Sequence, residues 1–383
     1  MTAHTTRSGP LTSLRVIEFA GIGPGPFAAM MLADMGADVI RIDRADSGKT
    51  QETDGPHPDL LNRGRRSIAL DLKSDAGRNM ANRLVDSADI VIEGFRPGVM
   101  ERLGLGPDEC LKRNPELIYG RMTGWGQTGP QAQFAGHDID YIAITGALHG
   151  FGRKGEPPVP PLNLVGDFAG GAMMLAFGLL AAALEVRHSG KGQVIDAAMV
   201  DGTALLTTAI HALRNRGIWT DERGVNLLDT GAPFYEVYEC ADGKYVAVGA
   251  IEPKFYRLLT ELVGLGESSL GPDSVQDQMD SSHWPERKEL WAKAFLAKTR
   301  DQWCEIAERS DACLAPVLDW NEAPHHPHLQ YRQTFVEDAG VTQPAPAPRF
   351  SRTPGRIQRP APHPGEHTSE IVTEFGLTAP VVP

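Results

Sequence analysis

The sequence contains few cysteines, and their spacing excludes two ways of stabilising a fold. The four cysteines in 383 residues are Cys110, Cys240, Cys304 and Cys313, and no two of them form a C-x-x-C pair. A disulfide framework or a structural zinc site would require paired or closely spaced cysteines. We therefore predict reduced thiols, as in a cytoplasmic protein.

The sequence also lacks a recognisable targeting signal and a long uninterrupted apolar run. Its first ten residues, MTAHTTRSGP, contain no basic stretch followed by an apolar core, and its last five, APVVP, do not match a peroxisomal S-K-L signal. The longest apolar run, residues 169–184, includes three glycines and is short for a membrane span. We expect this run to form a buried core helix, and we expect no membrane partner.

Signature motifs of several enzyme classes are missing. There is no G-x-S-x-G nucleophile elbow and no Walker phosphate loop, so the hydrolase and kinase classes lose their main support. The cluster His325-His326-Pro327-His328 is interrupted by proline and lies in a loop-like context, which disfavours a metal site. A formal net charge of −12 argues against a nucleic-acid partner.

The first third of the chain alternates β-branched runs with helical segments. Residues 14–20 (LRVIEFA) predict a strand, residues 27–35 a small-residue helix and residues 38–42 a second strand, which together form a β-α-β unit. Further strands and a helix are predicted at 67–71, 76–85, 89–93 and 117–122. This alternation predicts a doubly wound, Rossmann-like α/β domain with a parallel sheet.

The pattern changes in the second half of the chain. The segment YEVYECADGKYVAVGAI predicts a hairpin with its turn at Asp242-Gly243, and residues 254–263 and 284–307 predict helices. Residues 343–364 are rich in proline and predict an extended segment that returns to the first domain or to a partner subunit. The predicted organisation is a large domain at 1–219, a small α+β domain at 220–325 and a returning C-terminal segment at 326–383.

The loop after the first strand resembles a dinucleotide-binding fingerprint. It reads Gly21-Ile22-Gly23-Pro24-Gly25-Pro26, and Asp43 follows Gly23 by twenty positions. However, Pro26 stands where a helix-packing glycine is expected, and the two prolines remove N–H groups that would hold a pyrophosphate. A tight strand-to-helix turn is therefore favoured over an NAD site.

Three ionisable residues are candidates for chemistry, and each also has an ordinary structural explanation. His137 follows a glycine, but a lone histidine is more often structural than catalytic. Asp167 precedes an apolar helix, where it is either an N-cap or a partly desolvated base whose pKa is raised by burial. Glu252 follows a predicted strand and precedes Pro253, a position that suits a functional group or a plain solvent-facing turn.

Basic residues gather in the first domain of this otherwise acidic chain. Several lie near predicted strand ends, which suits a ligand that carries phosphate groups. Scattered solubilising charge is the alternative for any single one of them. The residues are Arg41, Arg44, Arg63, Arg65, Arg66, Lys73, Arg96 and Arg102.

Six segments taken together resemble the class III CoA-transferase family. They are LRVIEFAGIGPGPFAAMMLADMGADVIRID, ADIVIEGFRPGVMERLGLG, GRMTGWGQTGP, AGHDIDYIAITG, PPLNLVGDFAGG and GKGQVIDAAMVDG, in family order. The resemblance spans residues 11–351. It implies a Rossmann-like large domain, a smaller domain and an interlocked homodimer whose active site lies between domains of different subunits.

Within this family the chain is similar to members that interconvert (R)- and (S)-2-methylacyl-CoA thioesters. The resemblance implies that His137 and Asp167 face the substrate α-carbon from opposite sides and that Glu252 supports His137. Coenzyme A is then part of the substrate, and no metal or redox cofactor is needed. The residues that match CoA-binding positions of the family are Arg44, Leu70, Asp71, Leu72, Lys73, Gly94, Phe95, Arg96, Arg102, Gly136, Asp138, Ile139, Asp140 and Tyr141.

Two alternatives to racemisation stay open. Transferases of the family use an aspartate at the position of Asp167 as a nucleophile, so Asp167 alone does not separate the two activities. Its pairing with His137 and Glu252 favours racemisation. The other alternative is a non-catalytic CoA-binding protein that keeps the fold. For a racemase, we expect backbone N–H groups at the start of the Asp167 helix to stabilise the enolate oxygen.

Overall fold

The computed structural model describes residues 7–45, 59–270, 274–338 and 340–377. The described chain forms two compact units. Unit 1 contains Met1–Thr145, Leu162–Leu206 and His328–Pro383, and unit 2 contains Gly146–Pro161 and Thr207–Pro327. The short segment 146–161, which belongs to the large domain in the sequence-based division, clusters with unit 2. It is held there by an ion pair between Arg153 and Glu236 (2.8 Å) and by a hydrogen bond from Arg223 to the His149 carbonyl (2.8 Å).

Six strands of the described chain form one parallel sheet in unit 1, as the alternating sequence pattern predicts. The strand order is β3-β2-β1-β4-β5-β6, and every neighbouring pair is parallel. This order reverses direction between β1 and β4, as in doubly wound folds. The strands are β1 (Arg15–Phe19), β2 (Asp38–Arg44), β3 (Arg66–Leu70), β4 (Ile90–Glu93), β5 (Ile118–Thr123) and β6 (Gln193–Ala198).

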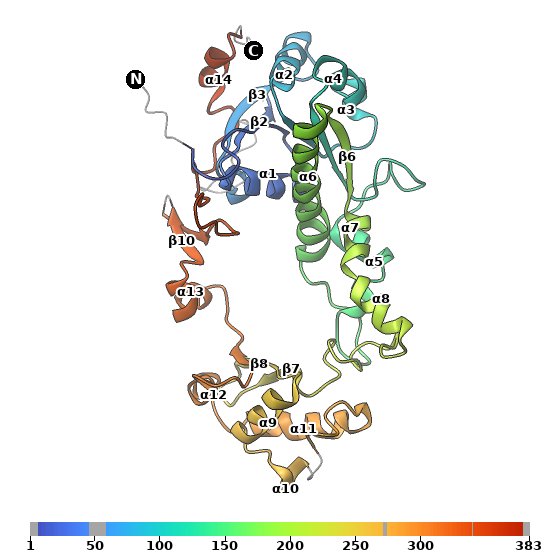
Figure 1. Ribbon diagram of the computed structural model, residues 1–383, viewed down its shortest axis with the longest axis vertical. Coiled ribbons are helices and arrows are strands. Elements are labelled where there is room, and N and C mark those ends of the chain that lie inside the picture. Colours follow the sequence, from blue (N-terminus) through green and yellow to red (C-terminus); the bar gives the residue numbers. More distant parts are fainter. Residues whose placement is uncertain (1–6, 46–58, 271–273, 339, 378–383) are drawn as a thin grey trace. The chain divides into compact units, whose positions relative to one another are not determined.

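Helices cover both faces of this sheet (Figure 1). Successive strand side chains point to opposite faces, so Val16 packs in the core beneath α1 and α6, whereas Ile17 packs in the core beneath α2 and α4. The burial of nearly every residue of the central strands β1 and β4 agrees with a sheet sandwiched between helices. The helices of this unit are α1 (Pro24–Asp34), α2 (Asp75–Asp86), α3 (Val99–Arg102), α4 (Pro107–Arg113), α5 (Asp138–Ile144), α6 (Met174–Ser189), α7 (Met199–Leu206) and α14 (Thr368–Glu374).

Unit 2 is a small α+β structure built on the predicted hairpin. Strands β7 (Tyr235–Glu239) and β8 (Tyr245–Gly249) pair antiparallel, and β9 (Leu314–Pro316) extends the sheet. Gly243 in the turn has a φ of 72°, which glycine adopts without strain. The helices of this unit are α8 (Thr208–Asn215), α9 (Pro253–Leu262), α10 (Glu267–Leu270), α11 (Trp284–Phe295) and α12 (Arg300–Ala307); α13 (Pro327–Tyr331) begins at the last residue of unit 2 and otherwise belongs to unit 1.

The prediction of one helix over residues 284–307 is wrong. The chain forms α11 and α12 instead, because Thr299 starts a new helix. Its side chain accepts a hydrogen bond from the Gln302 N–H (3.3 Å), and the Gln302 side chain accepts one from the Thr299 N–H (3.0 Å). This reciprocal capping box satisfies two backbone donors that would otherwise lack partners.

The C-terminal segment returns to unit 1, one of the two destinations that its proline-rich sequence allows. Strands β10 (Phe335–Asp338) and β11 (Val341–Pro344) form a hairpin. Buried Arg63 holds this hairpin against α1, since it donates to Asp34 (2.6 Å), to the Gln343 side chain (2.8 Å) and to the Pro344 carbonyl (2.7 Å). Arg63, a member of the predicted basic set, therefore serves the fold.

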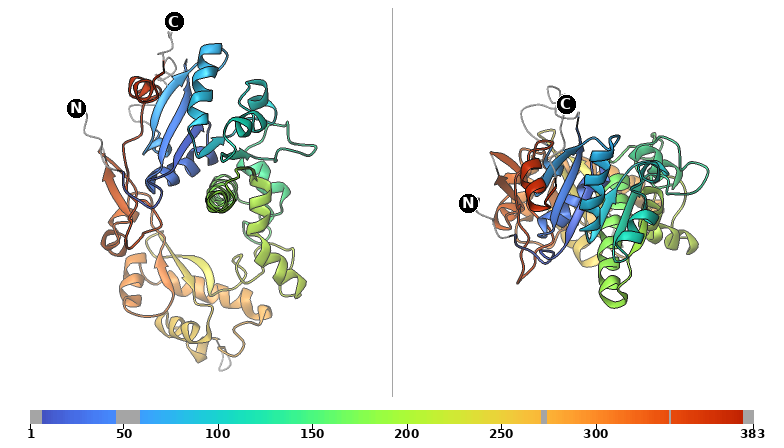
Figure 2. Two further views of the ribbon diagram at one scale, coloured as in Figure 1. Left: turned by 45° about the horizontal axis from the view of Figure 1, so that its top comes forward. Right: turned by 90° about the horizontal axis from the view of Figure 1, so that it is seen from above.

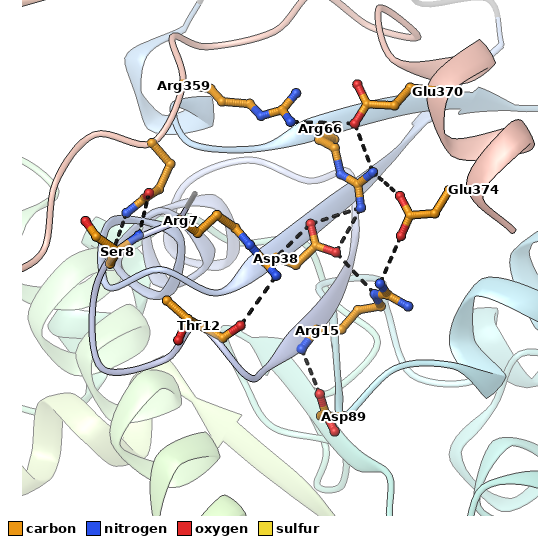
Figure 3. Close-up of polar contacts among 11 residues, drawn as sticks. Arg7, Ser8, Thr12, Arg15, Asp38, Arg66, Asp89, Arg359, Glu370 and Glu374 are labelled. Carbon is orange, nitrogen blue, oxygen red and sulfur yellow. Dashed lines mark hydrogen bonds and ion pairs between the residues drawn. The ribbon is translucent and has the colours of Figure 1, made fainter. Parts of the chain in front are cut away.

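Helix α14 packs beside the edge strand β3 (Figure 2) and is held there by charge as well as by apolar contacts. Arg66 lies between the sheet and the helix, donating to Asp38 (2.8 Å) on one side and to Glu374 (2.5 Å) on the other (Figure 3). Ile371 and Val372 are buried in the core on the α2 side of the sheet. Protection of this edge by α14 limits unwanted strand pairing.

The prediction that residues 169–184 form a buried core helix holds for only one face. Leu175 and Leu179 of α6 are buried against the sheet, but Met173, Phe177 and Leu184 are 48%, 73% and 69% exposed. Within the described residues, the stretch Leu164–Ser189 is long and apolar enough to cross a membrane by length and composition alone. A core helix of a soluble protein meets the same two criteria.

Candidate active site

A cavity of about 650 Å³ lies in unit 1 at the carboxyl ends of the central strands. Its lining includes Phe19 at the end of β1, Glu93 at the end of β4 and Thr123 at the end of β5. The strand order reverses between β1 and β4, and doubly wound proteins bind ligands at this position. His137 and Asp167 both line this cavity.

The loop Gly21–Pro26 forms one wall of the cavity and leads directly into α1. Pro24 occupies the first turn of the helix, where its missing N–H is not needed for intrahelical bonding. Gly23 has a φ of 67°, and a Cβ added to it would lie 3.1 Å from Asp167 Oδ2. Glycine therefore lets the loop come close to the Asp167 carboxylate. Asp43, the acidic residue of the fingerprint-like pattern, instead accepts hydrogen bonds from Ser67 Oγ (2.6 Å) and Arg41 Nε (2.9 Å).

Asp167 lies inside a π-helical segment, Leu164–Met173, which continues into α6. π-helical turns are rare and often occur at functional sites. Burial raises the pKa of the Asp167 carboxyl, and the negative charge of Asp138 adds to the rise; a hydrogen bond from Asn163 Nδ2 (3.1 Å) and the charge of His137 oppose it. The environment therefore favours a carboxyl that holds a proton more readily than an ordinary aspartate.

The N-cap explanation of Asp167 is wrong. Asn163 occupies that position, four residues before Asp167, because the helix begins earlier than the apolar pattern indicates. The backbone N–H of Asp167 itself donates to Asp138 Oδ1 (2.7 Å). Stabilisation of an enolate oxygen by other N–H groups at the start of this helix stays a prediction.

His137 is the N-cap residue of α5, and its side chain is exposed at the cavity wall. Its backbone N–H donates to Asp140 Oδ2 (2.9 Å), which fixes the start of the helix. One turn further, buried Tyr141 donates to the Gly136 carbonyl and packs edge-on against Trp125 with ring centres 4.7 Å apart. Burial raises the pKa of Tyr141 to about 12, so this tyrosine stays protonated near neutral pH. The backbone that carries His137 is therefore held from both sides.

Several of the predicted CoA-binding residues lie at the carboxyl ends of the strands of the same sheet. Arg44 ends β2 and is paired in register with Leu70, which ends β3, so the segment 70–73 begins beside it. Gly94, Phe95 and Arg96 follow β4 and line the cavity. Parallel strands bring all of these positions to one edge. The Leu70 side chain lies in the core, so only its backbone remains for a ligand.

The other predicted CoA-binding residues lie around α3 and α5. Arg102 ends α3, and its guanidinium lies close to Gly98 at the start of that helix. Gly136 and Tyr141 line the cavity, whereas Ile139 and Asp140 are exposed on the first turn of α5. Asp138 differs from its neighbours because it is buried.

A chain of ion pairs that starts at Glu93 in the cavity wall was not predicted from sequence. Buried Glu93 accepts hydrogen bonds from the Phe95 N–H (2.8 Å) and from Arg121 Nε (2.8 Å), and Arg121 also pairs with Glu101 (2.7 Å). These contacts fix the Gly94–Arg96 turn and the helix that carries Arg102. The position of Glu93 at the end of a predicted strand was the one sequence signal that could have identified it.

Glu252 belongs to unit 2, unlike His137 and Asp167. It is exposed at the N-cap of α9, directly after β8, and its carbonyl accepts hydrogen bonds from the Phe255 and Tyr256 N–H groups (both 2.9 Å). Its side chain makes no capping hydrogen bond. The carboxylate therefore remains open to another partner.

The three histidines between residues 325 and 328 lie within the described ranges. Those ranges contain no group of three or more His, Cys, Asp or Glu side chains that could hold a metal ion.

The fold and the cavity define a Rossmann-like α/β protein with a cavity at the switch point of its parallel sheet. The chain belongs to CoA-transferase family III, whose sequence pattern matches residues 11–368.

Known relatives agree with this family. α-Methylacyl-CoA racemase of Mus musculus is 47% identical over 370 residues, covering 96% of this chain and 94% of the mouse protein. The racemase of the same name from Homo sapiens is 46% identical over 371 residues, with the same coverage. The crystal structure of a CAIB/BAIF family protein from Brucella suis is similar with a TM-score of 0.83 and 26% identity, covering 96% of this chain and 100% of that one.

Proposed function

We propose that this protein is an α-methylacyl-CoA racemase that interconverts (R)- and (S)-2-methylacyl-CoA thioesters. The observation that carries the proposal is that two groups able to exchange protons, His137 and Asp167, line one cavity in a chain similar along almost its whole length to racemases. Inversion of a C–H centre needs a base on one face and an acid on the other. A lone nucleophilic aspartate would not need the histidine.

The reaction requires two proton transfers at the α-carbon. One of the two residues removes the α-proton, which leaves a planar enolate of the thioester, and the other delivers a proton to the opposite face. A thioester suits this chemistry because deprotonation of a neutral acyl group produces a single negative charge. The raised pKa of Asp167 lets its carboxyl act as proton donor in one direction and, once ionised, as base in the other.

The substrate would lie across the carboxyl ends of the strands of the parallel sheet. Arg44, Lys73, Arg96 and Arg102 supply positive charge for the phosphate groups of coenzyme A, which is part of the substrate. Glu252 is proposed to orient His137. The proposal requires no metal or redox cofactor, and it places the enzyme in the cytoplasm.

Solvent exchange at the α-carbon tests the proposed function. In D₂O, each pure enantiomer of a 2-methylacyl-CoA is expected to take up deuterium at the α-carbon and to become racemic, without any acceptor acid. A CoA-transferase would instead depend on an acceptor acid and would form an aspartyl thioester that hydroxylamine traps. Coenzyme A binding without exchange would indicate a non-catalytic relative. Either result would contradict racemisation.

We further propose a homodimer in which α6 contributes to the subunit contact. Met173, Phe177 and Leu184 are spaced so that they lie on one side of the helix, and Figure 1 shows α6 running beside the edge strand β6. A contiguous exposed apolar face of this kind is typical of a protein interface, and a second copy of the chain would cover it.

Phe177→Glu combined with Leu184→Glu is expected to convert the dimer into monomers. Burying two carboxylates in an apolar contact is unfavourable, so the contact should be lost. Light scattering coupled to size-exclusion chromatography measures the change. Lys112→Glu on α4, which lies on the opposite face of the sheet, is the control and should remain dimeric. A double variant of unchanged mass would contradict the proposed interface.

A further inference from the structure

Asp138 links the two proposed proton-transfer residues. It follows His137 directly in the sequence, at the first position of α5, and its Oδ1 accepts the backbone N–H of Asp167 at 2.7 Å. The residue is only 8% exposed. The carboxylate therefore points into the protein, toward the π-helical segment, and not toward solvent where a CoA group would meet it.

The close fit around the Asp138 carboxylate depends on a glycine. A Cβ added to Gly166 would lie 2.4 Å from Asp138 Oδ1, so any larger residue there would displace the carboxylate. The other oxygen, Oδ2, is buried and has no hydrogen-bond partner among the described residues. Burying a carboxylate with one oxygen unpartnered is costly, so a purely structural acceptor would be better served by a neutral side chain.

The remaining charges near this pair do not cancel that of Asp138. The first turn of α1, which packs on the π-helical segment, contains no acidic residue. Ionisable side chains on the elements around the pair include His137 before α5, Asp140 and Tyr141 of α5, Asp201 of α7, Arg121 of β5, Asp196 of β6, Glu93 at the end of β4 and Arg96 after it. Of these, the charge of His137 opposes the rise in the pKa of Asp167 that Asp138 causes.

We propose that Asp138 is a positioning residue, whose carboxylate holds the Asp167 backbone in place and sets a negative charge behind the Asp167 carboxyl. A nearby like charge makes a carboxyl keep its proton to higher pH. The inference rests on the proposed racemase function, because it assigns Asp138 the task of keeping Asp167 able to donate. It replaces the predicted role of the Asp138 side chain in CoA binding.

Asp138→Asn separates charge from geometry, because asparagine keeps an acceptor oxygen for the Asp167 N–H but carries no charge. The acid limb of the kcat/KM profile for racemisation is expected to move to lower pH by about one unit, with little change in KM. Asp108→Asn, which also removes a carboxylate from the first turn of a helix (α4), should leave the limb in place. An unmoved limb in Asp138→Asn overturns the proposal. So does a raised KM with unchanged kcat, since that indicates a substrate contact.

A second measurement does not depend on activity. With ¹³C-labelled aspartate carboxyl groups, NMR titration follows Asp167 directly, its signal being assigned by its absence in Asp167→Asn. Its pKa is expected to fall in Asp138→Asn, and an unchanged pKa overturns the inference even if the enzyme proves not to be a racemase. Conversely, a lowered pKa in a protein that exchanges no α-proton rejects the proposed function alone.

Gly166→Ala provides an independent steric test of the same contact. The added methyl should push the Asp138 carboxylate away from the Asp167 N–H, and kcat should fall about tenfold or more, as for misplacement of a reacting group. Circular dichroism checks that the variant remains folded. A folded Gly166→Ala enzyme with wild-type kcat would show that the contact does not position Asp167.

Discussion

Asp167→Asn and His137→Gln, made separately, are each expected to lower α-deuterium exchange by about 10²–10⁴-fold. Both changes keep the approximate shape of the side chain and remove its ability to carry a proton to or from carbon. Because the two-base reaction uses one residue on each face of the α-carbon, neither can replace the other. The measurement is deuterium incorporation by NMR or mass spectrometry, started from each enantiomer in turn.

Glu252→Gln provides the comparison for these variants. It is proposed to orient a base without moving the proton, so its loss should cost less than that of either His137 or Asp167. Equal activity of wild type and either base variant would contradict the two-base assignment. If Asp167→Asn alone were inactive while His137→Gln stayed fully active, the transferase alternative would gain direct support.

Arg65→Met is expected to destabilise the protein by about 3–5 kcal/mol, because it leaves a buried carboxylate without its main partner. Arg65 and Glu18 are both fully buried, and Arg65 Nε lies 2.5 Å from Glu18 Oε2. Arg65 also donates to the carbonyls of Leu61 and of Pro26 in the loop that forms the cavity wall. Urea-induced unfolding followed by circular dichroism measures the loss.

Removal of both charges separates the cost of an unpaired ion from the cost of lost packing. The double variant Glu18→Gln, Arg65→Met should be more stable than Arg65→Met alone, because no uncompensated buried charge remains. Lys112→Met, which breaks a solvent-exposed pair with Glu109, should change stability little. If the double variant were less stable than the single one, the ion pair would not be the source of the effect.

The buried pair of Arg65 and Glu18 also shows that sequence alone does not separate arginines that stabilise the fold from arginines that bind a ligand. Arg41, Arg63, Arg65 and Arg66 belong to the basic set that suggested a phosphate-bearing ligand, yet each forms ion pairs with carboxylates within the fold. The partners Glu18, Asp34 and Asp38 lie 23 to 47 residues away on neighbouring strands and helices. Strand order decides such pairings, and strand order is not visible in local composition.

The sequence by itself determined the strands, most of the helices and the residues worth testing. Continuous β-branched runs specify the strands of the parallel sheet, which are buried on both faces, and alternation specifies the hairpin at Asp242-Gly243, where burial repeats every second residue. The motif order identified His137, Asp167 and Glu252 as candidates. The strand and helix patterns are local in the sequence, and the motifs are shared by the whole family. Both can therefore be recognised in a single sequence.

Only the tertiary structure decided how Asp167 is held. The contact from its N–H to Asp138 joins residues 29 positions apart. The exposure of one face of α6 and the approach of Gly23 to the Asp167 carboxylate likewise depend on which elements pack together. Apolar periodicity places a helix only to within a few residues, and here the helix begins at Leu164, before Asp167. Packing between distant segments sets that start, and with it the hydrogen bonds and charges that surround the carboxyl.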